Sequence, residues 1–191
     1  MRVEKGLTLV EVLIAMGITA IVGVLLLVII VNSAGLFTNQ SSKVQMGLNS
    51  NDALVVVRSS IKQAYTVAEQ YTNGSDTYTS GSNQLVLQVP AIDSSNSVIT
   101  DTYDYYIFYL DSNTLHFKVF PDSASSRKTA DRIFSTSIDN LTFQYFNSAI
   151  PPREVIPTAA IRIKMTLVIK QRSGASFETN IATSEANLRN I

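Results

Sequence analysis

The stretch Lys5-Gly6-Leu7-Thr8-Leu9-Val10-Glu11, followed by the apolar run from Val12 to Val31, decides the fold of this chain. The run holds about 20 residues, and at about 1.5 Å per residue a helix of that length spans about 30 Å, the thickness of a bilayer core. No charged residue occurs between Val12 and Lys43. The stretch therefore predicts a membrane-spanning helix with one carboxylate, Glu11, inside its apolar segment.

The charges around this helix predict its orientation. Arg2 and Lys5 lie on its N-terminal side, so the positive-inside rule places the N-terminus in the cytoplasm and everything after Val31 outside. A cleaved signal peptide is the rival interpretation, and Asn32-Ser33-Ala34-Gly35 offers small residues for a cut. The apolar segment is too long for a signal peptide, which favours a membrane anchor.

Composition excludes several classes of function. The chain has 191 residues, 15 basic and 15 acidic, with a formal net charge of zero, one His and no Cys. Disulfides, thiolate metal sites and cysteine nucleophiles are therefore excluded. Lys and Arg are scattered rather than clustered, so there is no direct nucleic-acid motif.

The residues after the apolar run predict a continuation of the helix. No proline occurs before Pro90, and apolar residues recur at helical spacing as far as residue 70. This stripe consists of Val44, Leu48, Leu54, Ile61, Tyr65 and Ala68. An amphipathic helix of this kind needs a sheet to cover its apolar side.

The remainder of the chain predicts an antiparallel sheet with one packed face and one wet face. The segment 71–83 is rich in Thr, Ser, Gly and Asn and is typical of a loop. Strands are expected at 85–89, ended by Pro90, then at 103–110 and 114–120 around a short turn at 111–113. Further strands are expected at 141–145, at 161–170 and, after a turn at Ser173-Gly174, near 177–181. The segments 121–132 and 148–157 show no clear periodicity.

The N-terminal stretch resembles the processing site of type IV prepilins and pseudopilins. In that family a membrane peptidase cuts after the glycine, on the cytoplasmic side, and methylates the new N-terminus. The resemblance implies a cut between Gly6 and Leu7 and N-methylation of Leu7, although many members carry Phe there. It also implies that Glu11 pairs with the N-terminal amine of a neighbouring subunit in a filament.

Physical chemistry makes this role for Glu11 reasonable. A carboxylate in hydrocarbon is unstable unless it is paired, and the new α-amino group of another helix carries the opposite charge. Such a pair sets the axial register between subunits more than it adds net stability. The plainer alternative is a single-pass anchor whose Glu11 reaches lipid headgroups. Glycine has no side chain, which allows a protease to approach the backbone at Gly6.

The resemblance implies an α+β, pilin-like fold with four parts: a leader removed at residues 1–6, a transmembrane and assembly helix at 7–35, its amphipathic outer half at 36–70, and a β-sheet head at 71–191. The 141–146 strand and the ending Leu188-Arg189-Asn190 are similar to minor pilins and pseudopilins of the PilW and GspJ type. No proline interrupts the apolar helix, which favours a minor subunit over a major one.

The function implied is that of a non-enzymatic structural subunit of a pilus, type II secretion or DNA-uptake (competence) filament. Its partners would be a prepilin peptidase, other pilin or pseudopilin subunits and the inner membrane, with the head outside and no cofactor. The alternative is a membrane-anchored extracytoplasmic binding domain that does not assemble.

Three groups in the head are weaker candidates for function. His116 has no nucleophile motif around it and is expected on the solvent face of its strand. Some pseudopilins bind calcium, but the acids here lack the loop pattern of a calcium site and are expected to be solvated turn residues. The aromatic residues of 103–109 are expected to pack in the sheet. The acids in question are Asp101, Asp104, Asp111 and Asp122.

Overall fold

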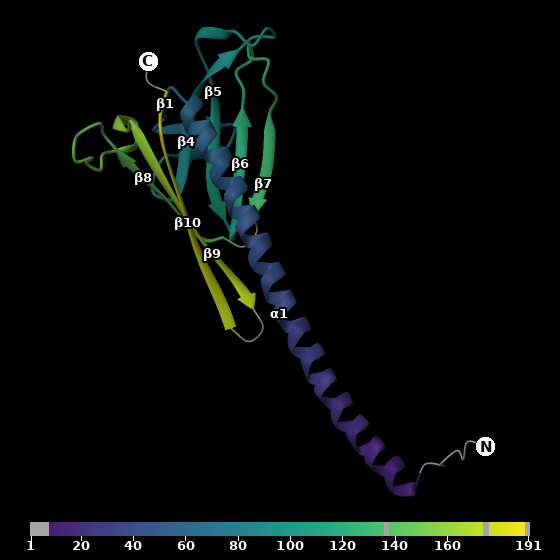
Figure 1. The fold of residues 1–191 in the computed structure, drawn as a ribbon. Helices are drawn as coiled ribbons and strands as arrows, with labels where there is room; N and C mark the ends of the chain where they lie inside the picture. Colours follow the sequence, from purple (N-terminus) through teal and green to yellow (C-terminus); the bar gives the residue numbers. More distant parts are fainter. Residues whose placement is uncertain (1–7, 136–137, 174–175, 190–191) are drawn as a thin grey trace. The chain divides into compact units, whose positions relative to one another are not determined.

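A computed structural model describes residues 8–135, 138–173 and 176–189; for residues 35–50, 135, 171–173 and 176 it describes the backbone alone. The chain divides into two compact units, Met1–Val44 and Gln45–Ile191, which we treat separately. Helix α1, Leu9–Gln63, is the only α-helix in the described residues, and ten strands follow it (Figure 1). The α+β, pilin-like fold class predicted from the sequence is confirmed.

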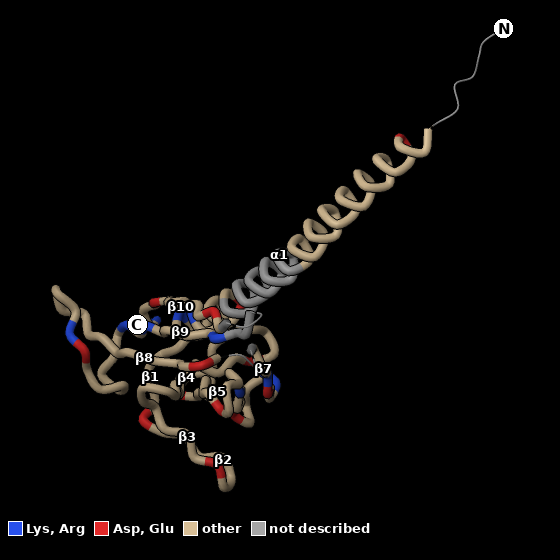
Figure 2. The backbone as a smooth tube through the Cα atoms, turned by 90° about the horizontal axis from the view of Figure 1, so that it is seen from below, with Lys and Arg blue, Asp and Glu red and all other residues tan. Residues whose placement is uncertain are grey.

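The first unit contains the apolar part of helix α1. Leu9–Ala34, 26 residues, is long and apolar enough to cross a membrane. Glu11 is the one charged residue in this segment, and Figure 2 shows the helix here without other charges. Its apolar composition agrees with the predicted membrane helix.

Helix α1 ends at Gln63, so the prediction of a helix through residue 70 is wrong. The amide of Ala64 still donates to the Ser60 carbonyl at 3.0 Å, but the amide of Tyr65 donates to the Gln88 carbonyl at 2.8 Å. The chain therefore leaves the helix to join the sheet as β1, Thr66–Val67. Tyr65, assigned to the helical stripe from the sequence, does not belong to it.

A five-stranded antiparallel sheet forms the larger half of the head. Its order is β1-β4-β5-β6-β7, with each described neighbour antiparallel. The strands are β4, Gln84–Ile92; β5, Val98–Asp111; β6, Thr114–Phe120; and β7, Ala130–Ser135. β7 was not predicted, because its sequence does not alternate apolar and polar residues.

Pro90 does not end its strand, contrary to the sequence prediction. It pairs with Tyr103 of β5, and β4 continues to Ile92 with a register shift. The neighbour on the other side, β1, pairs only with Leu87 and Gln88. Because β4 has an open edge at Pro90, the missing amide hydrogen leaves no ladder bond unmade on that side.

The predicted hairpin between β5 and β6 is confirmed. Asp111 pairs with Thr114, which leaves Ser112 and Asn113 as a two-residue loop. Their φ angles are 46° and 68°. Positive φ at both positions is the geometry of a type I′ turn, whose twist matches that of the flanking strands.

The segment 71–83, predicted to be a loop, contains a small hairpin. Its strands are β2, Gln70–Asn73, and β3, Asp76–Thr79. Gly74, with φ of 62°, lies in the turn between them. Tyr71 and Tyr78 pack against Phe120 of β6, with ring centroids 5.2 and 5.8 Å apart. Aromatic packing on the sheet thus orders a segment whose composition favours a loop.

A second antiparallel sheet has the order β10-β9-β8. The strands are β8, Ile138–Phe146; β9, Arg162–Ser173; and β10, Ser176–Asn187. β9 pairs with β8 only as far as Ile169, but with β10 as far as Ser173. The end of the β9–β10 hairpin therefore protrudes beyond β8, as Figure 1 shows. The predicted turn residue Gly174 lies outside the described residues.

One core joins both sheets and the end of the helix. Ala53, Val57 and Ile61 of α1 are at most 1% exposed, and they pack with buried residues of both sheets. The sheet residues in this cluster include Leu85, Leu87, Phe108, Leu115, Leu141, Met165 and Leu167. The spacing of four residues between the helix positions places them on one side of α1.

Candidate assembly site at the start of the helix

Glu11 lies in the first turn of α1, and together with Thr8 it caps the N-terminus of the helix. The Thr8 amide donates to Glu11 Oε2 at 2.9 Å, and the Thr8 hydroxyl donates to the same oxygen at 3.0 Å. The Glu11 amide is 3.3 Å from Thr8 Oγ1. This is a capping box, in which an N-cap Thr and a Glu three residues later satisfy each other's backbone amides.

The capping box has a clear signal in the sequence, although it was not among the predicted features. Thr-x-x-Glu immediately before an apolar run is the pattern of a helix start. Glu11 therefore has a local partner in the isolated chain, in addition to any partner on another subunit. The negative charge also lies at the positive end of the helix dipole, which favours it there.

The side chains around Glu11 provide a helix surface suited to packing. Every side chain from Thr8 to Ala34 is exposed in the isolated chain. The Thr19 hydroxyl donates to the Ala15 carbonyl at 2.8 Å, so its polar group is satisfied within the helix. Large apolar side chains such as Leu13 and Leu27, 60% and 64% exposed, require lipid or other helices around them.

Gly6 and Leu7, the predicted cleavage and methylation residues, lie outside the described residues. Thr8 is the first residue described, and it is the N-cap of α1. The predicted cut between Gly6 and Leu7 would thus place the new amine one residue before the N-cap. The cut itself remains a prediction.

In the head, Asp104 is the centre of a buried polar network. Its side chain is 0% exposed, and Arg127 Nη1 lies 2.5 Å from its Oδ2. The Asp122 amide and the Ser125 hydroxyl donate to the same carboxylate at 2.9 and 2.8 Å. Arg127 also donates to the Pro90 carbonyl. These bonds hold the loop after β6 against β4 and β5, which is a structural role.

This network changes the expectation for the four aspartates. Asp104 is a buried ion-pair partner rather than a solvated turn residue. Asp101, Asp111 and Asp122 are exposed, as expected for turn acids. Among the described residues, no cluster of three or more His, Asp or Glu side chains could hold a metal ion.

His116 is not on a solvent face, contrary to the sequence prediction. Its side chain is 19% exposed and its ring stacks on Tyr109, with centroids 5.0 Å apart. Lys118, two residues on, donates to the Tyr78 hydroxyl at 3.1 Å, and this bond raises the pKa of the Lys118 ammonium. The face of the five-stranded sheet that lies opposite the main core is therefore covered by aromatic rings in this region.

The aromatic residues predicted to pack in the sheet do so on both of its faces. Phe108 is fully buried in the main core and stacks on Phe117 at 4.6 Å. Tyr105 and Tyr109 pack on the opposite face with the β2–β3 hairpin. Burial raises the pKa of Tyr106, which also lies near Arg127. The cluster thus packs on both faces of the sheet, as predicted.

Comparisons with known proteins bear on the start of the chain. No curated protein matches the chain significantly. Residues 1–27 match the family model described as "Prokaryotic N-terminal methylation motif". This range contains Gly6, Leu7 and Glu11 together with most of the apolar helix. The chain therefore begins with an N-terminal methylation motif of the type IV prepilin kind.

Proposed function

We propose that this chain is a minor pilin or pseudopilin, a structural and non-enzymatic subunit of a type IV pilus or type II secretion-like filament. The observation that carries the proposal is the methylation motif at residues 1–27, directly on a helix long and apolar enough to cross a membrane. A prepilin peptidase cuts after Gly6 and methylates Leu7. The subunit resides in the inner membrane with its head outside, and it then enters a filament through contacts between helices.

The finer part of the proposal, a minor subunit, rests on short sequence likenesses in the head and on the apolar helix. Phe143 and Tyr145 of β8 are buried beside the long β9 strand, and Leu188 is buried near the chain end. These are the segments that resemble PilW- and GspJ-type subunits. The uninterrupted apolar helix agrees with a minor role. Pilus, type II secretion and DNA uptake are all machines that such a subunit serves.

Glu11 acts in this scheme as the partner of a neighbouring subunit's N-terminal amine. In a low-dielectric bundle of helices, the two opposite charges attract strongly and each offsets the other's desolvation. The capping box supports a second candidate function. If Glu11 only starts the helix, the chain is an anchored extracytoplasmic binding domain that does not assemble.

Three variants distinguish the two roles of Glu11. Glu11→Gln keeps a side chain that can cap the helix but removes the charge. Glu11→Ala removes both, and Thr8→Ala removes the hydroxyl cap but keeps the charge. We expect both Glu11 variants to fall at least about tenfold in filament incorporation, measured by immunoblot of sheared filaments, because they lack the charge that pairs with the amine. Thr8→Ala should retain most incorporation.

Mass spectrometry of the mature N-terminus accompanies each variant, so that loss of processing is separated from loss of assembly. The wild-type chain should begin at methylated Leu7. A chain that still begins at Met1 in cells with an active prepilin peptidase would refute the proposal. Incorporation of Glu11→Gln at the wild-type level, with Thr8→Ala as defective as Glu11→Ala, would show that Glu11 only caps the helix. A correctly processed wild-type chain that is absent from filaments would favour the anchored domain.

A further inference from the structure

The free edge of β10 faces the region where α1 ends. The Leu188 amide donates to the Ile161 carbonyl beside β9 at 2.8 Å, whereas the next amide, of Arg189, donates to the Ala64 carbonyl at 3.0 Å. Consecutive residues of a strand direct their amides to opposite sides. The side of β10 away from β9 is therefore the side on which Ala64 follows the helix.

The same alternation shows which backbone groups of β10 have no partner strand. Even-numbered residues share the side of Leu188 and bond to β9, so Ile181, Thr183 and Glu185 direct their amides and carbonyls to the free edge. Among the described residues, β10 pairs with no strand other than β9. Unpaired edge groups of this kind are ready to accept another strand.

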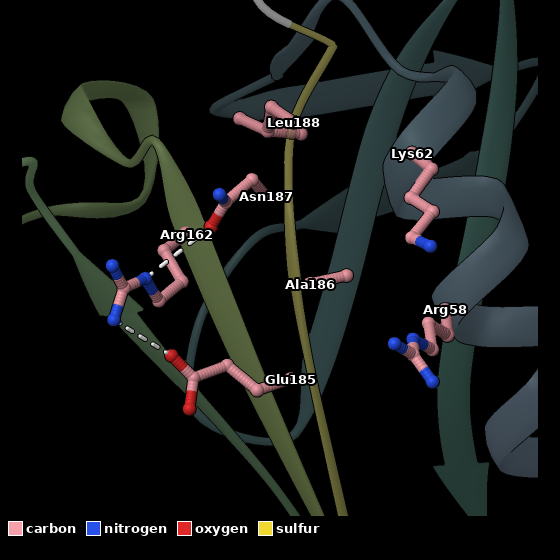
Figure 3. A pocket seen from close by; sticks show the side chains of 7 residues that line it. All are labelled: Arg58, Lys62, Arg162, Glu185, Ala186, Asn187 and Leu188. Carbon is pink, nitrogen blue, oxygen red and sulfur yellow. Dashed lines mark hydrogen bonds and ion pairs between the residues drawn. The ribbon is translucent and has the colours of Figure 1, made fainter.

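A groove of about 480 Å³ runs along this edge. Four consecutive residues line it, 185–188, and consecutive strand residues point to opposite faces. The groove therefore follows the backbone of β10 rather than one face of the sheet. Arg58 and Lys62, one turn apart on α1, line its other side, and Figure 3 shows them on the helix, across from β10.

The charge of the groove is positive. Arg162 lines it as well, but its Nη1 lies 3.1 Å from Glu185 Oε1, so those two charges offset each other. Arg58 and Lys62 belong to none of the ion pairs among the described side chains. The charge of Lys62 is stabilised by the helix dipole, because Lys62 lies in the last turn of α1. Arg58 lies one turn earlier and has less of this stabilisation. Within the described part of the chain, these two cations thus have no carboxylate partner.

We infer that this groove binds an extended, acidic segment of a partner protein, which adds a strand to the free edge of β10. Backbone bonds to residues such as Thr183 and Glu185 would hold the segment in place, the mode of recognition known as β-augmentation. Carboxylates on the segment's α1-facing side would pair with Arg58 and Lys62. The opposite side would carry apolar residues beside Ile181, which is 66% exposed. The inference does not rest on cleavage at Gly6 or on Glu11.

A synthetic peptide provides the test. The probe is an end-blocked, fluorescently labelled peptide of alternating Glu and Val, titrated with the full chain in lipid nanodiscs and followed by fluorescence anisotropy. We expect the double variant Arg58→Glu with Lys62→Glu to weaken binding at least about tenfold. The matched control, Lys128→Glu with Arg132→Glu, makes the same charge change at exposed cations away from the groove and should bind as wild type does.

A charge-swapped peptide guards against variants that fail to fold. The double variant at Arg58 and Lys62 should bind a Lys-Val peptide about as tightly as the wild-type chain binds the Glu-Val peptide. Failure of the wild-type chain to bind the Glu-Val peptide, or equal weakening by the control variant, would overturn the inference. Self-association of the chain that the groove variant abolishes would assign the edge to a second copy instead.

Backbone methylation tests strand addition separately from charge. In an extended peptide the Glu amides face one edge and the Val amides the other. One peptide carries N-methyl groups on the Glu amides and a second carries them on the Val amides. We expect only one of the two to bind as the parent does, because only one set of amides faces β10. A strand that adds in the opposite direction presents its other edge, so a third peptide carries N-methyl groups on both sets of amides. If this third peptide binds as the parent does, edge pairing is wrong.

Discussion

At the scale of single residues, the Asp104–Arg127 pair places a carboxylate in the interior of the head. Asp104 is fully buried, and Arg127 supplies the opposite charge while two further donors complete the carboxylate's bonds. A buried pair of this kind adds little relative to apolar packing, but loss of one partner leaves an uncompensated charge.

We therefore predict that Arg127→Ala lowers the free energy of unfolding of the head by about 3 kcal/mol. The measurement is urea unfolding of the full chain in detergent, followed by circular dichroism. Arg132→Ala, at an exposed arginine of β7, is the control and should stay within about 0.5 kcal/mol of wild type. The double variant Arg127→Ala with Asp104→Ala should be less destabilised than the sum of the two single variants. Additive effects would show that the pair is not coupled.

At the scale of elements, the β5–β6 hairpin depends on its two-residue turn. Ser112 and Asn113 both adopt positive φ, which non-glycine residues adopt at a cost. Asn-Gly is the preferred pair for a type I′ turn. We expect Ser112→Asn with Asn113→Gly to raise the free energy of unfolding by about 0.5–1 kcal/mol.

The opposite substitution sharpens this test of the turn. Asn113→Val places a β-branched residue at positive φ and should lower the free energy of unfolding by about 1–2 kcal/mol. Urea midpoints of the two variants give the comparison. Equal midpoints would mean that the strands determine this hairpin and that the turn geometry contributes nothing.

The elements that could be predicted are those whose own pattern matches their burial. β8 and β9 alternate buried and half-exposed residues, as the sequence does. β7 could not be predicted in this way, since Asp131, Arg132 and Ile133 are all exposed on an edge strand. β2 and β3 depend on distant aromatic rings, and the helix end depends on pairing with β4. These are tertiary effects that override local composition.

The same distinction applies to the candidate sites. Glu11 could be found from the sequence, because a carboxylate beside a membrane-length apolar run is unusual, and the capping box follows from Thr8 three residues before it. The groove could not be found, because Arg58 and Lys62 meet Glu185 and Leu188 only in the folded head. Likewise, nothing near Asp104 in the sequence indicates that Arg127 pairs with it.

At the scale of the whole molecule, the described side chains that form the core of the head all belong to the second unit. Every buried residue of the main cluster falls between Ala53 and Leu188, and the unit begins at Gln45. The last turns of α1 supply Val57 and Ile61 to that core. The helix thus contributes to the head as a structural element, independently of what its apolar first half does.

We predict that residues 45–191, produced alone, fold cooperatively, and that residues 64–191 do not. The shorter piece lacks Ala53, Val57 and Ile61, so the apolar residues of both sheets that pack against them become exposed to water. Circular dichroism, urea unfolding and binding of a hydrophobic dye give the comparison. Within the longer piece, Val57→Ser should lower the unfolding midpoint strongly, while Val55→Ser, at a position 55% exposed, should change it little. Cooperative unfolding of 64–191 at the midpoint of 45–191 would show that the sheets form their core without the helix.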